Sequence, residues 1–285
     1  MNICRFENRE GQIGIGLVES RSTVVDLSET GIDCLTRLLE SQQPAADIKA
    51  LLHPRLPRYA LADLHLRAPV DQQEVWAAGV TYLRSKTARM EESDFSATAY
   101  DRVYVAERPE LFFKSLPEKV AATGEPVGIR RDARWSVPEP ELALVLSSRG
   151  KVVGYTIGND MSSRDIEGEN LLYLPQAKIY ERSCALGPWI TLEQSEEEAR
   201  KWQIRLEIKR NGAAAFKGET SVTQIKRSFQ DLADFLFRCQ TFSQGAVLLT
   251  GTGIVPPDDF SLQKDDVVEI EISGIGVLRN HVVVV

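Results

Sequence analysis

Three acidic side chains in the middle of the chain have the types and the spacing of a metal site. Glu139 and Glu141 are two positions apart in an extended run, so both side chains project to the same side of a strand. Asp160 ends a second β-rich run, and the short turn near Arg149 can join the two runs only as an antiparallel hairpin. Counting back from that turn places Asp160 across from Glu139. We therefore expect three carboxylates to converge on one point.

Clustered carboxylates raise one another's pKa unless a cation neutralises them. The predicted set offers only hard oxygen ligands, which favours Mg²⁺, with Mn²⁺ or Ca²⁺ as further choices, over Zn²⁺. Pro138 and Pro140 flank Glu139 and donate no ladder hydrogen bonds, so this strand end is expected at an edge or an opening of the sheet. The alternative is an exposed acidic strand end, which is common on protein surfaces.

Composition limits the class of protein. The chain has 285 residues and a formal net charge of -7, with basic and acidic residues interspersed, which argues against nucleic acid or an anionic membrane as partner. No run approaches 18 apolar residues and the first residues lack the layout of a signal peptide, so we expect a cytoplasmic protein. The four cysteines lack CxxC spacing and are expected to be free thiols.

The elements that must position the acidic group fall into two parts. Residues 1–68 are predicted to form a small N-terminal domain, with two short strands, a helix and a proline-rich break, and none of its residues points to chemistry. Residues 69–285 contain many short strands and few helices, which favours a mostly antiparallel, rolled or barrel-like β domain. A charged, helix-biased stretch over 81–104 is either a solvated face or a lid over a site.

Further residues near the predicted hairpin can carry chemistry. Glu110 and Lys114 flank a short apolar strand before it. After it, the two serines at 162 and 163 are expected to cap a helix from Arg164 to about 172, which Pro175 ends. Lys178 then lies in an apolar stretch, where it is either a desolvated base or carboxylate clamp, or a lysine whose ammonium reaches the surface.

A glycine-rich turn near the C-terminus is a second candidate for binding an anion. It contains Thr250, Gly251, Thr252 and Gly253 after a short apolar run. Backbone amides in such a turn can hold a carboxylate or an oxyanion. The turn is too short for a Walker motif, which argues against nucleotide binding.

These motifs, in this order, resemble those of the fumarylacetoacetate hydrolase superfamily over nearly the whole chain. The resemblance implies an α+β, mainly β fold, a mixed β-sandwich roll with a small N-terminal α/β domain, in a dimer or a dimer of dimers. It also implies that Glu139, Glu141 and Asp160 bind Mg²⁺. The matching features are FFK at 112–114, the E-x-E pair, GYT..ND.S.RD at 154–165, Lys178, Gly187-Pro188 and the TGTG turn.

One departure from the family pattern narrows the expected activity. Many hydrolases and decarboxylases of the family carry Gly-x-Asn-Tyr-x-x-His followed by a Glu; here Ser85 stands at the His position and Ala88 at the Glu position. This argues against carbon–carbon bond hydrolysis. The stretches GVTYLRSK, RPELFFK and ENLLYLPQAKIY are most similar to the sugar-acid dehydratase branch, typified by 2-keto-3-deoxy-D-arabinonate dehydratase.

The resemblance to that branch implies a Mg²⁺-dependent hydro-lyase that dehydrates a 2-keto-3-deoxy sugar acid, a pentonate, to 2-oxoglutarate semialdehyde. Glu110 and Lys178 are then the acid–base pair, with the division of roles between them open. Lys114, Thr250 and Thr252 are expected to contact the substrate.

Two alternatives come from other classes. The first is a hydrolase or decarboxylase of β-diketo acids, of the fumarylacetoacetate, acylpyruvate or oxaloacetate type, against which the missing His argues. The second is a metal-stabilised binding protein without activity. The presence of Glu110 and Lys178 beside the complete acidic trio argues against it.

Overall fold

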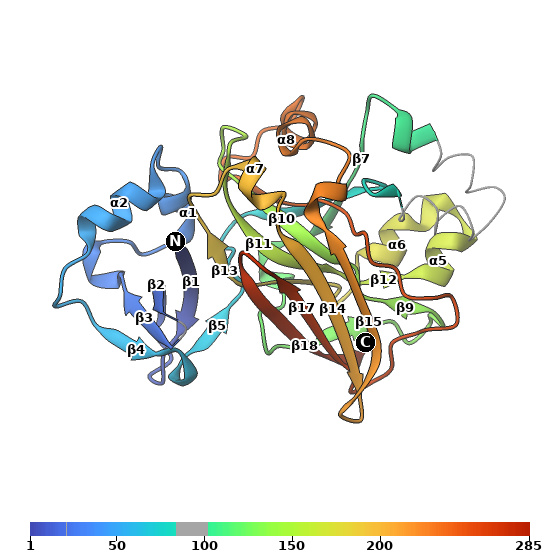
Figure 1. Cartoon of the computed structure of the whole chain (residues 1–285), viewed down its shortest axis with the longest axis horizontal. Helices are drawn as coiled ribbons and strands as arrows, with labels where there is room; N and C mark the ends of the chain where they lie inside the picture. Colours follow the sequence, from blue (N-terminus) through green and yellow to red (C-terminus); the bar gives the residue numbers. More distant parts are fainter. Residues whose placement is uncertain (21, 84–101) are drawn as a thin grey trace.

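The computed structural model describes residues 1–20, 22–83 and 102–285. Most of the charged 81–104 stretch, including Ser85 and Ala88, lies outside the described residues. Strands dominate the described chain, as expected for an α+β, mainly β fold (Figure 1). Among the described residues, no helix is both long enough and apolar enough to cross a membrane.

The strands form a large sheet, a smaller sheet and a short pair. The large sheet has the order β4-β3-β2-β1-β13-β11-β10-β16-β6-β7, with β5 beside β1. Its strands are β1 (Asn2–Glu7), β2 (Ile13–Ser20), β3 (Thr23–Asp26), β4 (Arg58–Ala60), β5 (His65–Arg67), β6 (Glu74–Gly79), β7 (Glu110–Ser115), β10 (Pro140–Leu146), β11 (Val152–Asp160), β13 (Cys184–Thr191) and β16 (Ala246–Leu249).

The smaller sheet has the order β15-β14-β17-β18-β8. It consists of β8 (Val127–Ile129), β14 (Gln203–Arg210), β15 (Ala213–Ser221), β17 (Val267–Ile272) and β18 (Gly276–Val284), while β9 (Ser136–Val137) pairs with β12 (Ser162–Ser163). The α-helices that the argument uses are α1 (Leu35–Leu39), α2 (Pro44–Leu51), α5 (Arg164–Glu169), α6 (Leu174–Lys178), α7 (Glu196–Ala199) and α8 (Phe229–Phe237).

The main hydrophobic core lies between the two sheets. Leu142 and Leu144 of β10 pack in one cluster with Ile204 and Leu206 of β14. Burial alternates along β14, as expected for a sheet with one face in the core and one in water, whereas every residue of β10 is buried. Each fully buried side chain of this size contributes roughly 1.5–3 kcal/mol to folding, so the acidic hairpin is built on a fully buried strand of the sandwich.

Helix α8 covers one end of this core (Figure 1). Its N-terminus is capped by Ser228, whose hydroxyl accepts a hydrogen bond from the amide of Asp231 at 3.0 Å. Its apolar stripe, with Phe229, Leu232 and Leu236, packs on the main cluster.

The N-terminal strands extend the large sheet at one end of the molecule, shown in blue at the left of Figure 1. β1 pairs antiparallel with β13, with Ile3 opposite Ile190. A second apolar cluster combines residues of α1 and α2 with Val145 and Ile190 of the later strands. Residues 1–68 therefore build most of a second apolar core, which residues of the later strands complete. A domain boundary at 68 stays a prediction.

The predicted acidic hairpin is present, in the predicted register. Pro140 of β10 lies opposite Asn159 of β11, and the next pair outward is joined by a hydrogen bond from the Asp160 amide to the Glu139 carbonyl at 3.0 Å. The turn closes with a hydrogen bond from the Gly150 amide to the Ser147 carbonyl. Local periodicity was sufficient to predict this register, because a short turn allows the two strands to pair in only one antiparallel arrangement.

This strand end was expected at an edge or an opening of the sheet, and the structure shows an opening. β10 is an interior strand between β11 and β16. Pairing with β16 covers Ala143 to Leu146 only, so Pro140 extends beyond the partner that would need its missing N–H. The prolines therefore mark an opening inside the sheet, where one neighbour ends before the other.

The expected single helix after Asp160 is wrong in its extent. α5 ends at Glu169, and Pro175 lies in the first turn of a separate helix, α6, instead of ending one. Proline suits a first turn because the amide hydrogen that it lacks has no partner there. Ser163 occupies the N-cap position of α5, but its side chain makes no capping hydrogen bond.

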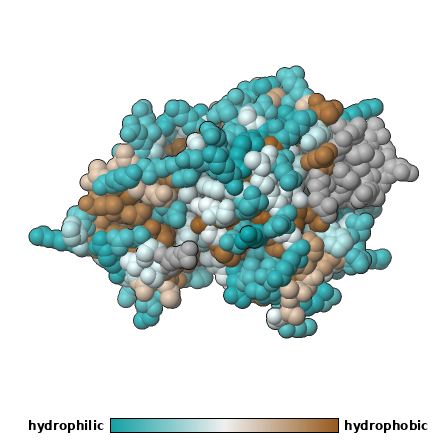
Figure 2. Space-filling model, viewed as in Figure 1, coloured by the Kyte–Doolittle hydropathy of each residue, from teal (hydrophilic) through white to brown (hydrophobic). Residues whose placement is uncertain are grey.

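The face of the molecule in Figure 2 is mostly hydrophilic, with apolar patches interspersed, one of them over the N-terminal end at the left. Single exposed apolar residues of this kind are normal on soluble proteins. α5 and α6 lie at the opposite end of the molecule from α1 and α2 (Figure 1).

Candidate active site

The three predicted metal ligands meet at the open end of the β10–β11 hairpin. Glu139, Glu141 and Asp160 each offer a carboxylate oxygen, these oxygens lie within 4.8 Å of one another, and all three side chains are buried. The prediction of three converging carboxylates is confirmed, and the alternative of an exposed acidic strand end is wrong. Oxygens at this spacing are the ligands that Mg²⁺ prefers, so the residues fit a bound magnesium ion.

Burial and the charges of its acidic neighbours act on Glu141 in the same direction. The pKa of Glu141 is raised well above its ordinary value, first by burial and then by the nearby charges of Asp160 and Glu139, while Lys178 and the Gly251 amide oppose the shift. A divalent cation at this point relieves both causes by favouring the ionised carboxylates.

Lys178 clamps two of the three carboxylates. Its Nζ donates to Glu139 Oε2 at 2.9 Å, to Asp160 Oδ2 at 2.9 Å and to Ser162 Oγ at 2.5 Å. The side chain is fully buried, so the expectation of a lysine reaching the surface is wrong. α6 positions it: the residue ends this short helix, directly beside the open end of the hairpin.

Two more cations contact the trio from other elements. Lys114 Nζ lies 2.5 Å from Asp160 Oδ1 and donates to the carbonyls of Met161 and Lys178. Arg164 of α5 is 3.3 Å from Glu139 Oε1 and is almost fully buried. These three cationic groups offset most of the negative charge of the buried carboxylates, with Arg164 shared between Glu139 and Glu167, and so reduce the large cost of unpaired buried charge.

The glycine-rich turn supplies an amide to the site. Gly251 donates its N–H to Glu141 Oε2, so this amide binds one of the protein's own carboxylates; binding of an anionic ligand by the turn stays a prediction. The residue has φ +89°, and a Cβ here would lie 2.2 Å from Thr81 Oγ1, so only glycine fits without displacing its surroundings.

The two threonines of the turn bind main chain. Thr250 Oγ1 donates to the carbonyl of Leu142 at 2.8 Å, and Thr252 Oγ1 accepts from the amide of Ile254 at 3.2 Å. Both are buried close to the trio's strand. Their assignment as substrate contacts stays a prediction, as does that of Lys114.

β7 carries the second acid–base candidate. Every second residue of this strand, Glu110, Phe112 and Lys114, projects to the same face. The Phe112 ring lies near the metal-site lysine, with Lys178 Nζ 5.8 Å from its centroid. The carboxylate of Glu110 occupies the space beside Gly79, where a Cβ would lie 1.9 Å from its Oε2. The strand thus aligns Glu110 and Lys114 on the same side, roughly 13 Å apart along the chain direction.

Beside Glu110 lies a cavity of about 320 Å³, lined among the described residues by Val103, Arg108, Pro109, Glu110, Glu167, Leu171 and Leu174. We call it the distal cavity. Sequence reasoning missed Glu167, and it quoted Ser162 and Arg164 within a family motif without predicting their contacts with Lys178 and Glu139. The three-residue spacing between Arg164 and Glu167 was a usable signal, since such residues face each other on a helix.

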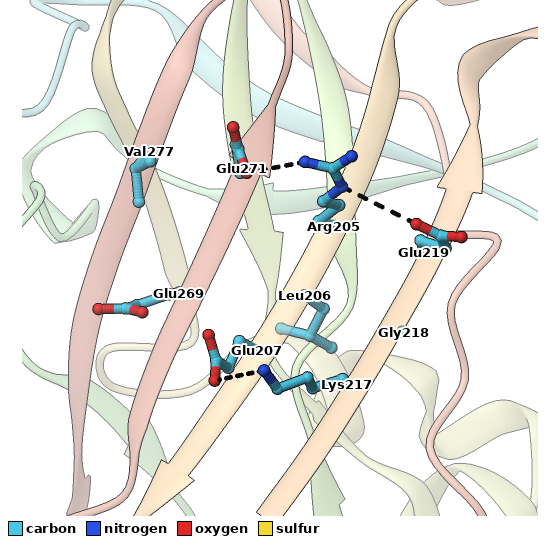
Figure 3. A pocket seen from close by; sticks show the side chains of 9 residues that line it. All are labelled: Arg205, Leu206, Glu207, Lys217, Gly218, Glu219, Glu269, Glu271 and Val277. Atoms are coloured by element: carbon cyan, nitrogen blue, oxygen red, sulfur yellow. Dashed lines mark ion pairs between the residues drawn. The ribbon is translucent and has the colours of Figure 1, made fainter. Parts of the chain in front are cut away.

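A different depression, of about 440 Å³, lies on the exposed face of the smaller sheet (Figure 3). Charged side chains such as Arg205, Glu219 and Glu271 line it, and none of the metal-site trio does. Its shape alone does not make it the chemical centre, because no buried group with a perturbed pKa reaches it.

The comparison with family models identifies the chain. Residues 74–283 match the fumarylacetoacetate (FAA) hydrolase C-terminal model. The chain belongs to this family. The resemblance drawn from its motifs is therefore confirmed.

Similar proteins within the family include dehydratases. The chain is 46% identical over 226 residues, 79% of its length and 78% of the relative's, to a probable 2-keto-3-deoxyxylonate dehydratase of Haloferax volcanii. It is 37% identical over 283 residues, 98% of its length and 95% of the relative's, to the 2-dehydro-3-deoxy-D-arabinonate dehydratase of Saccharolobus solfataricus.

A solved structure extends this similarity to the whole fold. It is a 2-keto-3-deoxy-D-arabinonate dehydratase complexed with magnesium and 2,5-dioxopentanoate, with a TM-score of 0.85 and 34% identity, and the match covers 100% of this chain and 99% of that one. The expected α+β, mainly β fold of the family is confirmed.

Proposed function

We propose that this protein is a Mg²⁺-dependent hydro-lyase that dehydrates a 2-keto-3-deoxypentonate to 2-oxoglutarate semialdehyde. The observation that carries the proposal is the buried Glu139, Glu141 and Asp160 trio with Lys178 donating to two of its members. The similarity to sugar-acid dehydratases along nearly the whole chain supports it. So does the 2,5-dioxopentanoate held by the similar solved structure, because this compound is 2-oxoglutarate semialdehyde.

The metal trio would hold Mg²⁺, with Glu139 and Asp160 steadied by Lys178 and Glu141 by the Gly251 amide. When bound, the ion supplies Lewis-acid chemistry that polarises the 2-keto group and makes the C3 protons acidic. Because Lys114, Lys178 and Arg164 offset most of the charge of the buried carboxylates, a bound ion would leave positive charge for the substrate carboxylate and for the negative charge that develops on the keto oxygen.

The remaining step is proton transfer. One member of the Glu110 and Lys178 pair removes a C3 proton, and the other donates a proton as the C4 hydroxyl leaves as water. Each contributes on the order of 10²- to 10⁴-fold as a general acid or base. The C3–H and C4–O bonds break and a C3–C4 double bond forms; moving two hydrogens from the C5 carbinol to C3 and C4 then gives the aldehyde.

Assembly and location belong to the same proposal. The family resemblance supports a homo-oligomer, a dimer or a dimer of dimers. Four free cysteines, two of them buried, fit a reducing cytoplasm, where thiols persist.

A substrate panel with and without EDTA tests the function. Purified protein is offered 2-keto-3-deoxypentonates, acylpyruvates and oxaloacetate, with products followed by mass spectrometry. We expect loss of water from a deoxypentonate, abolished by EDTA and restored by Mg²⁺. Cleavage of acylpyruvate, or loss of carbon dioxide from oxaloacetate, without dehydration of any deoxypentonate contradicts the proposal.

A further inference from the structure

The distal cavity adjoins the proposed catalytic carboxylate and contains a second one. Glu110 and Glu167 both line it, together with the apolar side chains of Leu171 and Leu174. Glu167 is 1% exposed although it belongs to a short surface helix, α5, whose neighbouring carboxylate Glu169 is exposed. Glu167 pairs with Arg164 and brings a buried negative charge to the wall of the cavity.

Glu167 is tied to the metal site through one guanidinium. Arg164 lies 3.3 Å from Glu139 Oε1 and 3.9 Å from Glu167 Oε2, both groups being almost fully buried. The same side chain therefore fixes a metal-ligand carboxylate and a cavity carboxylate in relation to each other. A substrate anchored at the trio by its keto acid end, with its C3 and C4 at Glu110, extends its remaining carbon towards this cavity.

The charges of the described lining favour a neutral, hydroxylated tail. Glu110 and Glu167 are acidic, whereas the guanidinium carbon of Arg108 stacks 5.6 Å from the centroid of the Phe235 ring and its side chain is exposed. A carboxylate accepts a strong hydrogen bond from a hydroxyl. It repels a second carboxylate, and such like-charge contacts are a common basis of specificity.

We propose that the distal cavity is the subsite for the C5 group of the substrate, and that Glu167 selects a hydroxymethyl group there and rejects a carboxylate. This inference rests on the proposed dehydratase function and adds a specificity-determining residue to it. It predicts a keto-acid site that accepts sugar acids and rejects dicarboxylic keto acids.

Three substrates that differ only at C5 test the inference. A 2-keto-3-deoxypentonate ends in CH₂OH, 4-hydroxy-2-oxopentanoate in CH₃ and 4-hydroxy-2-oxoglutarate in a carboxylate; each keeps the C3 methylene and the C4 hydroxyl that dehydration requires. For the unaltered enzyme with Mg²⁺, we expect kcat/KM to fall in that order. The hydroxymethyl group should be preferred to methyl by roughly 10- to 100-fold, the value of a hydrogen bond to a charged group.

Glu167→Gln should change the ratios between these substrates. We expect the preference for hydroxymethyl over methyl to shrink by about tenfold or more. Relative to the methyl compound, dehydration of the carboxylate compound should rise on the order of tenfold, because a repulsive charge is gone. Glu169→Gln, on the exposed side of the same helix, is the matched control and should leave all ratios unchanged.

Each outcome decides between roles for Glu167. An equal loss with all three substrates, or unchanged ratios, overturns the inference and leaves Glu167 a partner of Arg164 only. If Glu167→Gln does not fold, Glu167→Asp keeps the charge and withdraws it by one methylene, so the hydroxymethyl preference should fall while the carboxylate compound stays rejected. If the unaltered enzyme dehydrates none of the three, the proposed function itself has failed.

Discussion

The protein has two clusters in which acidic and basic side chains pair with each other. One cluster is buried and the other is exposed to water. At the metal site, Lys114 and Lys178 are fully buried against the acidic trio. On the exposed face of the smaller sheet, Arg205 lies between Glu219 and Glu271 at 3.8 and 3.7 Å, and Lys217 pairs with Glu207 at 3.1 Å (Figure 3). There the Arg205 and Lys217 side chains are 62% and 68% exposed.

The difference shows that charge density alone does not mark a functional site. Exposed ion pairs contribute about 0–1 kcal/mol each, because water already solvates both partners. Buried charges lose that solvation, so each depends on its neighbours, and removing one partner costs roughly 3–5 kcal/mol. A fold keeps such a cluster where chemistry needs shifted pKa values and fixed charges.

The largest expected effect comes from removing a metal ligand. Glu141→Gln keeps the shape of the side chain but removes a ligand charge, and a metal ion's contribution of several kcal/mol to the transition state corresponds to a loss in kcat on the order of 10³-fold. The Mg²⁺-dependent rise in unfolding temperature should also disappear. Glu219→Gln, in the exposed cluster, should change neither quantity. Unaltered metal content and turnover in Glu141→Gln would show that the trio is not the metal site.

Replacing Lys178 tests whether the buried cluster depends on each of its charges, and the readouts are the turnover rate and the free energy of unfolding. Lys178→Met leaves Glu139 and Asp160 without their shared donor, so we expect kcat to fall by roughly 10²-fold or more. In EDTA the free energy of unfolding should fall on the order of 3 kcal/mol, with part of the loss recovered on adding Mg²⁺. Lys217→Met is the exposed counterpart and should stay within about 0.5 kcal/mol. If the two variants lose the same free energy of unfolding, burial does not distinguish the two clusters.

A smaller effect is expected from moving a catalytic group without removing it. Gly79→Ala would place a Cβ 1.9 Å from Glu110 Oε2, so the carboxylate must shift. A displacement of about 1 Å lowers rates on the order of 10²-fold, while Mg²⁺ binding should be unchanged. The double variant with Glu110→Gln checks the cause: if the alanine acts through Glu110, adding it should cost nothing further. Strictly additive losses would point to general disruption of β6.

The smallest effect belongs to the exposed cluster. Arg205→Gln removes two surface ion pairs, and we expect a loss of less than about 1 kcal/mol in the free energy of unfolding, measured by urea denaturation. Raising NaCl to about 1 M shortens the Debye length to about 3 Å and should erase the loss. The cost of Lys178→Met should persist at the same salt concentration. A salt-independent effect at Arg205 would mean that its packing, and not its charge, stabilises the sheet.

The sequence predicted the parts of the site that depend on local pattern. Strand periodicity set Glu139 and Glu141 on one side, and a short turn fixed the pairing that brings Asp160 opposite Glu139. The family motifs indicated Lys178 and Glu110. Where local rules allowed two outcomes, the tertiary structure decided: Pro175 lies in the first turn of a helix instead of ending one, and the end of β10 lies at an opening instead of at a sheet edge.

The amino-acid sequence by itself therefore determined the acidic hairpin and its three converging carboxylates, because these depend on spacing over a few residues, and the order of its motifs indicated the family of the chain. Only the tertiary structure decided which cations surround the trio, since Lys114, Arg164 and Lys178 come from β7, α5 and α6. It also decided that Glu167 lines a cavity beside Glu110. Contacts between distant segments are fixed by how whole sheets and helices pack, and periodicity within one segment carries no information about that packing.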